Sequence, residues 1–481
     1  MKKILFSTLI IFMIHNEGRT QNVGIGTFNP IEKLDVDGAI KIGNTTSSTP
    51  GTIRWNSSIN DFEGFNGTRW VSLTSTSTVS TWVNQNVTES YSPIIRLNSG
   101  AGYQGTKLGL SLTSSGNYLL AGAPGDYHPG GFSRAGSIRL LKKINGTWTP
   151  YHTIYSGNPA SQAEFGYSVD MTGNNIISGS PNLGSGRAHI YTLTDTGGTV
   201  SVTIPALLTD VFGSNGDQFG YSVSITGDFA SAGAPAYGAD NKGRVYTYKR
   251  IGNLWVPMPA LTAPDALAND RFGQSISSSG QYMAIGAPYA EVNGLTDKGK
   301  VYIYKLNQAA TSWEYLTTLI EPHQEDSTYF GIEVCMRGDT LLIGQCGFHL
   351  ADNVIGRVYI YVRNETGWVL QATLSAPGQS KDDSFGRSVA FEDNTIVVGA
   401  HTAVVNDIVG KGKAYVYRHD GTGWKLASSL TSSGGNEMEG YGFAVSIIGG
   451  EIMVGAPGRA GLFAPMYFPI SDHGQLYMYH Q

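Results

Sequence analysis

The stretch Phe219-Gly-Tyr-Ser-Val223, with Gly233-Ala-Pro235 and Gly243-Arg-Val-Tyr-Thr-Tyr248 downstream, is the clearest copy of a unit that recurs seven times. In most copies a Trp-x5-Leu segment follows, here from Trp255 to Leu261. One glycine marks each copy, and these glycines lie 53 to 58 residues apart: Gly109, Gly166, Gly220, Gly273, Gly331, Gly386 and Gly442. A fixed period of this size that holds four strand-length segments is typical of a radial array of small sheets.

The third unit predicts its four strands at 219–225, 229–234, 243–248 and 255–261. The connection between the first two is Thr226-Gly-Asp228, and a glycine there supplies the positive φ that a tight hairpin needs. The first strand carries small residues and the third and fourth carry aromatic ones. This gradient of size predicts a ring in which the first strand of every unit lies nearest the axis.

The two ends of the repeat array complement each other. In six places the Leu or Ile that ends a fourth strand lies twelve residues before the next marker glycine, and Leu97 lies twelve residues before Gly109. Tyr91 occupies the position of the tryptophan, whereas the seventh unit stops after its third strand at Tyr479. Residues 91–97 are therefore predicted to supply the missing strand and to remove an unpaired sheet edge. The expected fold is all-β, a seven-bladed β-propeller closed by an N-terminal strand.

These motifs resemble the FG-GAP repeat, whose best-known members form the propeller head of integrin α subunits. The resemblance covers about 390 residues. Many members of the family carry an Asp-x-Asp-x-Asp-Gly calcium loop between the first two strands, where this chain has only short turns. The resemblance therefore implies no calcium at these sites, and no cofactor is expected.

The residues before the repeats divide into two segments. Residues 1–21 combine Lys2 and Lys3 with an apolar stretch from Ile4 to Ile14, the pattern of a secretory signal peptide. Residues 22–80 are expected to form a small β segment with a linker and resemble the N-terminal stubs of bacterial surface proteins and tail-fibre-like stalks. Strands are predicted at 51–55, 61–65 and 69–73, and residues 81–481 are assigned to the propeller. A secreted or cell-surface location follows, with a homotrimer formed through the stub as one option.

Composition excludes several kinds of partner. The net charge of −5 comes without a run of Lys or Arg, which argues against nucleic acid, and no segment after the signal is apolar enough to span a membrane. The only cysteines are Cys335 and Cys346. Pairing across the turn at Arg337 would set Cys335 opposite Leu342, about 13 Å along the strand from Cys346. Two free, buried thiols are therefore expected.

Connectivity assigns the loops to two faces. The turns within the first and third hairpins lie on one side, which we call the turn face, and the longer, dissimilar loops lie on the other, the long-loop face. Loops on a rigid scaffold usually carry binding. The candidate ligand residues on the long-loop face are the aromatic residues Tyr127, Tyr289, Phe348, Phe463 and Tyr467 and the carboxylates Asp217, Asp270 and Asp383.

Two interpretations of the carboxylates compete. A rim of acids, which also includes Glu164, Asp326 and Glu439, could hold a cation or a basic ligand. Alternatively each acid caps its loop by accepting backbone N–H bonds, because the acids follow the repeat. Glu333 differs, since it replaces the serine of the first strand and should lie near the axis. Such an acid either pairs with an arginine, the favoured expectation, or marks a site.

No catalytic or metal-binding residue is assigned from the sequence, because nucleophile, phosphate-loop and zinc spacings are all missing. The function that fits best is an exported surface protein that binds glycan or protein through the long-loop face. One alternative is a secreted polysaccharide-active enzyme, a glycosidase or lyase, which would place two carboxylates across the mouth. Another is the structural tip of a trimeric stalk.

Overall fold

The computed structural model describes residues 105–196, 200–203, 206–210, 213–323, 327–346, 355–378, 383–432, 439–458 and 474–480, and the backbone of six strands before residue 99. The chain divides into two compact units, Met1–Asn86 and Val87–Gln481. All secondary-structure elements in these described parts are β-strands. They contain no helix with the length and apolarity needed to cross a membrane.

The first unit contains two small sheets. Strand β1 (Val23–Ile25) pairs in parallel with β2 (Leu34–Val36). Strands β3 (Ile53–Asn56), β4 (Asp61–Phe65) and β5 (Trp70–Ser72) form an antiparallel sheet in that order. This meander lies where the sequence predicts it.

The second unit consists of seven antiparallel sheets, the blades. In blades 1 to 6 the strands follow chain order from the innermost strand A to the outermost strand D, and in blade 7 the outermost strand comes from the start of the unit. Blade 1 contains β7 (Leu112–Ser115), β8 (Tyr118–Ala123), β9 (Ser137–Ile144) and β10 (Thr147–Tyr155). Blade 2 contains β11 (Ser168–Thr172), β12 (Asn175–Ser180), β13 (Arg187–Asp195), β14 (Val200–Val202) and β15 (Ala206–Thr209). Blade 3 contains β16 (Val223–Thr226), β17 (Phe229–Ala234), β18 (Arg244–Ile251) and β19 (Leu254–Pro257). Blade 4 contains β20 (Ser275–Ser279), β21 (Tyr282–Ala287), β22 (Lys300–Leu306) and β23 (Trp313–Ile320).

The remaining three blades repeat the same plan. Blade 5 contains β24 (Glu333–Arg337), β25 (Thr340–Gln345), β26 (Arg357–Asn364) and β27 (Gly367–Leu374). Blade 6 contains β28 (Phe385–Glu392), β29 (Thr395–Ala400), β30 (Lys413–His419) and β31 (Trp424–Leu430). Blade 7 contains β32 (Ala444–Ile448), β33 (Glu451–Ala456), β34 (Gln475–His480) and, from the start of the unit, β6 (Ser92–Asn98).

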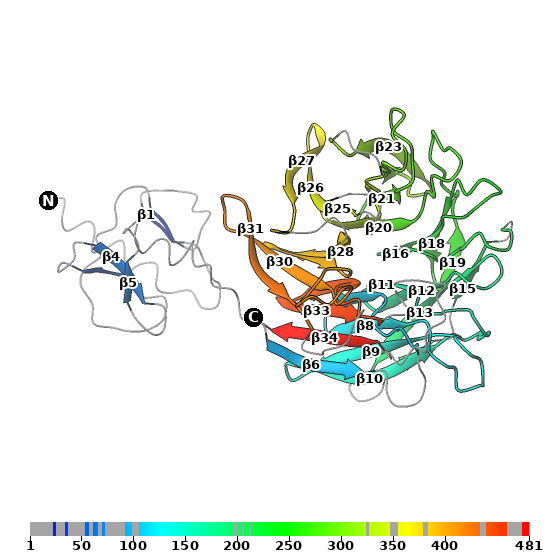
Figure 1. Ribbon diagram of the computed structural model, residues 1–481, viewed down its shortest axis with the longest axis horizontal. Coiled ribbons are helices and arrows are strands. Elements are labelled where there is room, and N and C mark those ends of the chain that lie inside the picture. Colours follow the sequence, from blue (N-terminus) through cyan, green and yellow to red (C-terminus); the bar gives the residue numbers. More distant parts are fainter. Residues whose placement is uncertain are drawn as a thin grey trace. The chain divides into compact units, whose positions relative to one another are not determined.

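The ring closes as predicted, because β6 pairs antiparallel with β34 and completes blade 7 (Figure 1). The register confirms that β6 is a true D strand. Its pairing skips Ile94, three residues after Tyr91, and the D strand of blade 4 skips Leu316, three residues after Trp313. The same one-residue bulge occurs in the D strands of blades 1, 5 and 6. Each innermost strand also contacts the innermost strand of the next blade, and β32 contacts β7.

Glycine allows neighbouring blades to approach each other closely. The marker glycines have φ between +87° and +91°, which explains why a glycine recurs there. The glycine of each Gly-Ala-Pro or equivalent segment has a different role. A β-carbon on Gly233 would come within 2.2 Å of the Gly273 carbonyl oxygen in the next blade. Strand A of blade 3 is predicted from residue 219 but begins only at Val223. Phe219 and Gly220 instead contact blade 2, where Phe219 forms a β-bridge with Gly186 and the Gly220 carbonyl faces Gly179.

The core between blades is built on one aromatic pair per repeat. The aromatic residue before the marker glycine is fully buried and packs edge-on against the first tyrosine of strand C, as Phe272 does with Tyr302 at 5.4 Å between ring centroids. Equivalent pairs occur in blades 3, 5, 6 and 7. Such pairs contribute about 1 kcal/mol beyond their buried area. In blade 1 both partners are replaced, since Leu108 stands for the phenylalanine and Arg139 for the tyrosine.

Two sequence expectations are corrected here. Blade 2 does not have one continuous D strand, because β14 and β15 pair with different halves of β13. Cys335 lies opposite Leu342 as predicted, and both cysteines are free. Cys346 is fully buried, but the prediction of burial is wrong for Cys335, whose side chain lines the space at the axis and is partly accessible.

Candidate functional site

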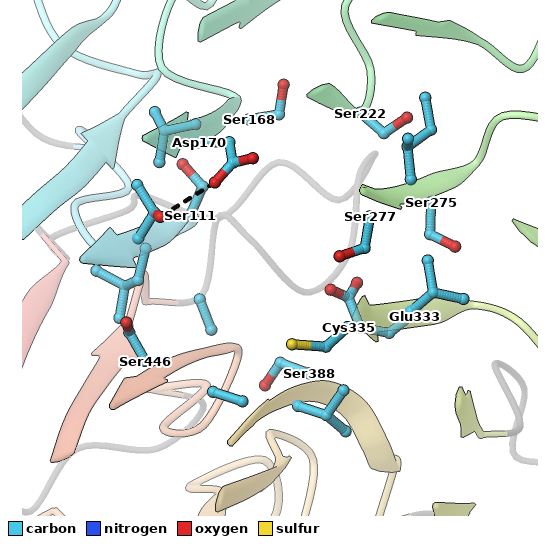
Figure 2. Close-up of a pocket in the computed structure, with 18 of the residues that line it drawn as sticks. Ser111, Ser168, Asp170, Ser222, Ser275, Ser277, Glu333, Cys335, Ser388 and Ser446 are labelled. Carbon is cyan, nitrogen blue, oxygen red and sulfur yellow. Dashed lines mark hydrogen bonds between the residues drawn. The ribbon is translucent and has the colours of Figure 1, made fainter. Parts of the chain in front are cut away.

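The innermost strands enclose a cavity of about 470 Å³ along the axis of the ring, which we call the axial pocket. Figure 2 shows side chains from successive blades, including serines, Asp170, Glu333 and Cys335, arranged around one central space. The pocket begins at the long-loop face with the residue that follows each marker glycine. It extends along the A strands to Thr172 and Arg337 beside the A–B turns of the opposite face. Pockets of this size commonly hold small ligands.

A ring of serines links the blades around this pocket. The serine two positions after the marker glycine donates a hydrogen bond to the marker carbonyl of the next blade, as Ser222 does to Gly273 at 2.7 Å. The same bond joins blades 1, 2, 4 and 6 to their neighbours, through Ser111, Ser168, Ser275 and Ser388. Since each hydroxyl hydrogen is used, the serine oxygen retains lone pairs that can accept a hydrogen bond from the pocket.

Glu333 interrupts the ring of serines in blade 5. Burial raises the pKa of its carboxyl to about 7, and the positive charge of Arg387 opposes this shift only in part. The expected direct pairing with an arginine is not found, because Glu333 forms no ion pair with any residue that the structure describes. Arg387 acts on this carboxyl only through its electrostatic field. An acid whose pKa is moved to neutrality inside a cavity is characteristic of functional sites.

Arg387 of blade 6 lines the axial pocket at its mouth. Burial alone would lower its pKa, but the fields of Tyr221, Glu333 and Tyr167 act in the opposite direction and the net effect is an increase. Tyr167 and Tyr221 belong to blades 2 and 3, so the guanidinium lies within electrostatic range of the far wall. Their rings contact each other at 5.1 Å between centroids.

The rest of the mouth holds the guanidinium in place. The Arg387 guanidinium carbon lies 5.1 Å from the centroid of Phe443, a cation–π contact with the adjacent blade. His401 packs edge-on against the same aromatic ring, and burial, together with the charge of Arg387, lowers the histidine pKa to about 3. His401 is therefore neutral at physiological pH. The described residues offer Arg387 no carboxylate within ion-pair distance.

Asp170 lies deeper and is already used by the fold. It accepts hydrogen bonds from the backbone N–H groups of Ile225 and Met171, both at 2.8 Å, and from the hydroxyl of Thr113 at 3.3 Å. These bonds connect blade 2 to blades 1 and 3. Burial raises its pKa despite them. Asp170 is therefore a link between three inner strands.

The chemistry available to the pocket is polar but not metal-binding. Burial raises the pKa of the Cys335 thiol to about 12, so it remains protonated at neutral pH. Within the part of the chain that the structure describes, no three His, Cys, Asp or Glu side chains converge as a metal site requires. The arrangement suits a ligand held by hydrogen bonds and one charge.

The rim carboxylates predicted as ligand residues lie outside this pocket. Asp217 accepts a hydrogen bond from the Ser214 N–H at 2.7 Å, and Asp270 from the Leu267 N–H at 2.8 Å. Both are buried, as is Asp383. The geometry of Asp217 and Asp270 matches the capping interpretation. Glu164 instead forms ion pairs, with Lys107 at 3.2 Å and with Arg134, and Asp326 lies outside the described residues.

The predicted aromatic residues separate into two groups. Tyr127 has 37% of its surface exposed on the loop after β8, beside the similarly exposed Phe132. Tyr289 is partly buried, stacks edge-on with Tyr329 at 5.3 Å and lies beneath the guanidinium of Arg271 at 4.8 Å. The other three predicted ligand residues, Phe348, Phe463 and Tyr467, lie outside the described residues.

Sequence reasoning missed the residues of the mouth, although a signal was present. The position after the marker glycine carries six different residue types in the seven units, while the glycine before it is constant: Leu110, Tyr167, Tyr221, Gln274, Ile332, Arg387 and Phe443. A variable position inside a constant structural frame is where a scaffold adapts to a ligand. Of the residues singled out from the sequence, Glu333 and Cys335 reach the pocket.

Comparisons with known proteins find one family model and distantly similar structures. The FG-GAP repeat family matches at residues 206–248, 255–304 and 368–417, each match running from a D strand to the C strand of the next blade. A crystal structure of a protein from Lactobacillus plantarum matches with a TM-score of 0.45 and 14% identity, covering 81% of this chain and 95% of the other. The structure of Sqt1 from Saccharomyces cerevisiae matches with a TM-score of 0.42 and 8% identity, covering 76% and 83%. No curated protein matches the chain. The chain is therefore a seven-bladed β-propeller that contains FG-GAP repeats at these three places.

Proposed function

We propose that this protein is an exported binding protein that recognises a glycan or a protein through the long-loop face of its propeller. The observation that carries the proposal is the mouth of the axial pocket, where Arg387 lies among Tyr167, Tyr221 and Phe443 without an acidic partner among the described residues. An arginine and aromatic side chains in a concave site are typical of binding centres.

The loops around this mouth add apolar surface that a ligand could cover. Tyr127 and Phe132 are exposed on the loop of blade 1, and Val404 and Val409, exposed by 40% and 59%, lie on the loop of blade 6. Exposed apolar residues that flank a polar cavity favour recognition of a large partner. Export is proposed from the apolar stretch between Ile4 and Ile14.

Binding fits the pocket better than hydrolysis. A glycosidase uses two carboxyl groups on either side of the scissile bond. The described lining residues offer Glu333 and Asp170, and Asp170 already accepts hydrogen bonds from Ile225, Met171 and Thr113. Glu333 alone remains available.

The proposal is tested by probing glycan and protein arrays with the full chain and with two double variants. Tyr127→Ala with Phe132→Ala removes aromatic surface from the long-loop face and should weaken binding about tenfold, which corresponds to about 1.4 kcal/mol. Leu254→Ala with Val256→Ala removes exposed apolar surface from the outer strand β19 and should leave binding unchanged. Loss of signal in the β19 variant alone, or no signal from the unmodified chain, would contradict the proposal.

A further inference from the structure

The mouth of the axial pocket presents three kinds of polar group that the fold itself does not satisfy. The first is the Arg387 guanidinium, whose cation–π contact with Phe443 orients its plane but uses none of its N–H donors. No carboxylate of the described residues lies within ion-pair distance of it. A planar fork of donors without a partner matches a carboxylate in shape and charge.

The second group is the amide of Gln274 in blade 4. This side chain is 7% exposed and lines the pocket, and its Oε1 atom has no hydrogen-bond partner among the described residues. A buried acceptor without a donor costs free energy that a ligand hydroxyl could recover. Gln274 occupies the variable position of the repeat, as do Tyr221 on one side and Ile332 on the other.

The third group is Glu333, below the mouth and beside the ring of serines. It forms no hydrogen bond or ion pair with the residues described. A carboxyl that is protonated for part of the time can donate to a ligand oxygen, and its carbonyl oxygen can accept from a ligand hydroxyl. The serine oxygens, such as that of Ser388, can accept further hydrogen bonds, because each hydroxyl already donates its hydrogen to a carbonyl of the next blade.

We propose that the axial pocket binds an acidic sugar unit, with its carboxylate on Arg387 and its ring hydroxyls on Gln274, Glu333 and the serine ring. The inference rests on the proposed binding function and names the ligand class for it. A volume of about 470 Å³ accommodates a ligand of one or two sugar units, within the range of ordinary ligand pockets. Several hydroxyl-binding groups arranged around a single cation favour a sugar acid over a simple anion.

Proton linkage gives the site a direction of pH dependence. The charged or titratable groups near Glu333 are Arg387 of β28, Cys335 of its own strand and Cys346 after β25, and only the arginine is charged at neutral pH. A bound carboxylate repels ionised Glu333, so the protonated form binds more tightly. Affinity is therefore expected to fall as pH rises through about 7, and binding should raise the pKa of Glu333 by the same linkage.

Isothermal titration calorimetry of the full chain tests this with three probes: glucuronic acid, glucose and inorganic phosphate. Glucuronic acid should bind at least about tenfold more tightly than glucose or phosphate, and more tightly at pH 6 than at pH 8. Equal affinities for glucuronic acid and glucose would overturn the proposal. Phosphate binding as tight as that of glucuronic acid would overturn the sugar assignment.

Variants assign the effect to residues. Arg387→Met should lower the affinity for glucuronic acid at least about tenfold, whereas Arg250→Met, which removes the same charge from an exposed ion pair with Asp228, should not change it. Glu333→Gln replaces the titrating carboxyl by a neutral amide, so the affinity of this variant for glucuronic acid should be the same at pH 6 and at pH 8. Should Arg387→Met fail to fold, Arg387→Lys retains the charge without the planar fork and should still weaken binding. Unchanged affinity in Arg387→Met or in Arg387→Lys contradicts the inference.

The outcome separates this inference from the proposed function. Array binding that depends on Tyr127 and Phe132, together with no response to glucuronic acid, removes the inference and leaves the proposed function in place. Binding of glucuronic acid in the calorimeter without any array signal removes the proposed recognition through the long-loop face and supports the acidic-sugar site.

Discussion

Replacing Glu333 by serine restores the residue that five of the seven blades carry at this position, and we expect it to stabilise the protein in a pH-dependent way. Burial raises the pKa of this carboxyl from an ordinary value of 4.5 to about 7. At about 1.4 kcal/mol per pH unit, the difference corresponds to about 3 kcal/mol of lost stability once the group is ionised.

The sign follows from proton binding. The native carboxyl holds its proton more tightly than the unfolded chain does, so stability decreases as pH rises from about 4.5 to about 7, and the full penalty persists above pH 7. In Glu333→Ser this penalty is absent. The new hydroxyl can also donate to the Gly386 carbonyl as its counterparts do, which is worth about 1 kcal/mol at any pH. The variant should therefore exceed the parent by about 4 kcal/mol at pH 8 and by about 1 kcal/mol at pH 4.5.

Urea unfolding monitored by tryptophan fluorescence at pH 4.5, 6 and 8 measures this difference. Glu333→Gln serves as a second variant, since it removes the charge without supplying the serine bond. Glu365→Ser is the matched control, because Glu365 is exposed on the turn after β26 and its loss should change stability little at either pH. An advantage of Glu333→Ser that is the same at pH 4.5 and pH 8 would refute the reasoning.

Three further predictions concern the scaffold. Gly233→Ala should destabilise the protein by about 3 kcal/mol or more, because the added β-carbon would lie 2.2 Å from the Gly273 carbonyl oxygen of the next blade. Gly227→Ala is the control: it has open space around it and a φ of +56°, so it should cost only about 1 kcal/mol. Thermal unfolding compares the two variants, and equal losses of stability would contradict the close approach at Gly233. Cys335 and Cys346 should react slowly with iodoacetamide at pH 8, since burial raises both thiol pKa values to about 12, and mass spectrometry should find both alkylated readily only after unfolding. Asp217→Ala should lower the free energy of unfolding by about 1 kcal/mol, because the carboxylate no longer accepts the hydrogen bond from the Ser214 N–H, and binding on the arrays should stay unchanged. A variant that loses binding but keeps full stability would instead assign Asp217 to a ligand site.

Ring closure illustrates how far local patterns reach. The twelve-residue interval before Gly109 predicts strand 91–97, and the structure places β6 against β34 with the bulge at Ile94 that the D strands of blades 1, 4, 5 and 6 share. This prediction succeeds because strand pairing depends on the spacing of the repeat motifs and on the alternation of apolar and polar residues, both of which can be read from the sequence. Blade 2 is the exception, since it lacks the tryptophan that marks a D strand and divides that strand between β14 and β15.

The arrangement of the side chains that line the axial pocket could not be predicted in this way. The repeat alone predicts that Glu333 lies near the axis, but it cannot tell that Arg387 forms no ion pair with this acid and lies within electrostatic range of Tyr167 and Tyr221. Those interactions join blades 2, 3, 5 and 6 across the axial pocket, so they depend on the diameter of the closed ring and on side-chain rotamers. Period, hydrophobic alternation and glycine positions act between neighbours and set the seven blades. The meeting of side chains from opposite blades arises only after closure brings them within reach of one another.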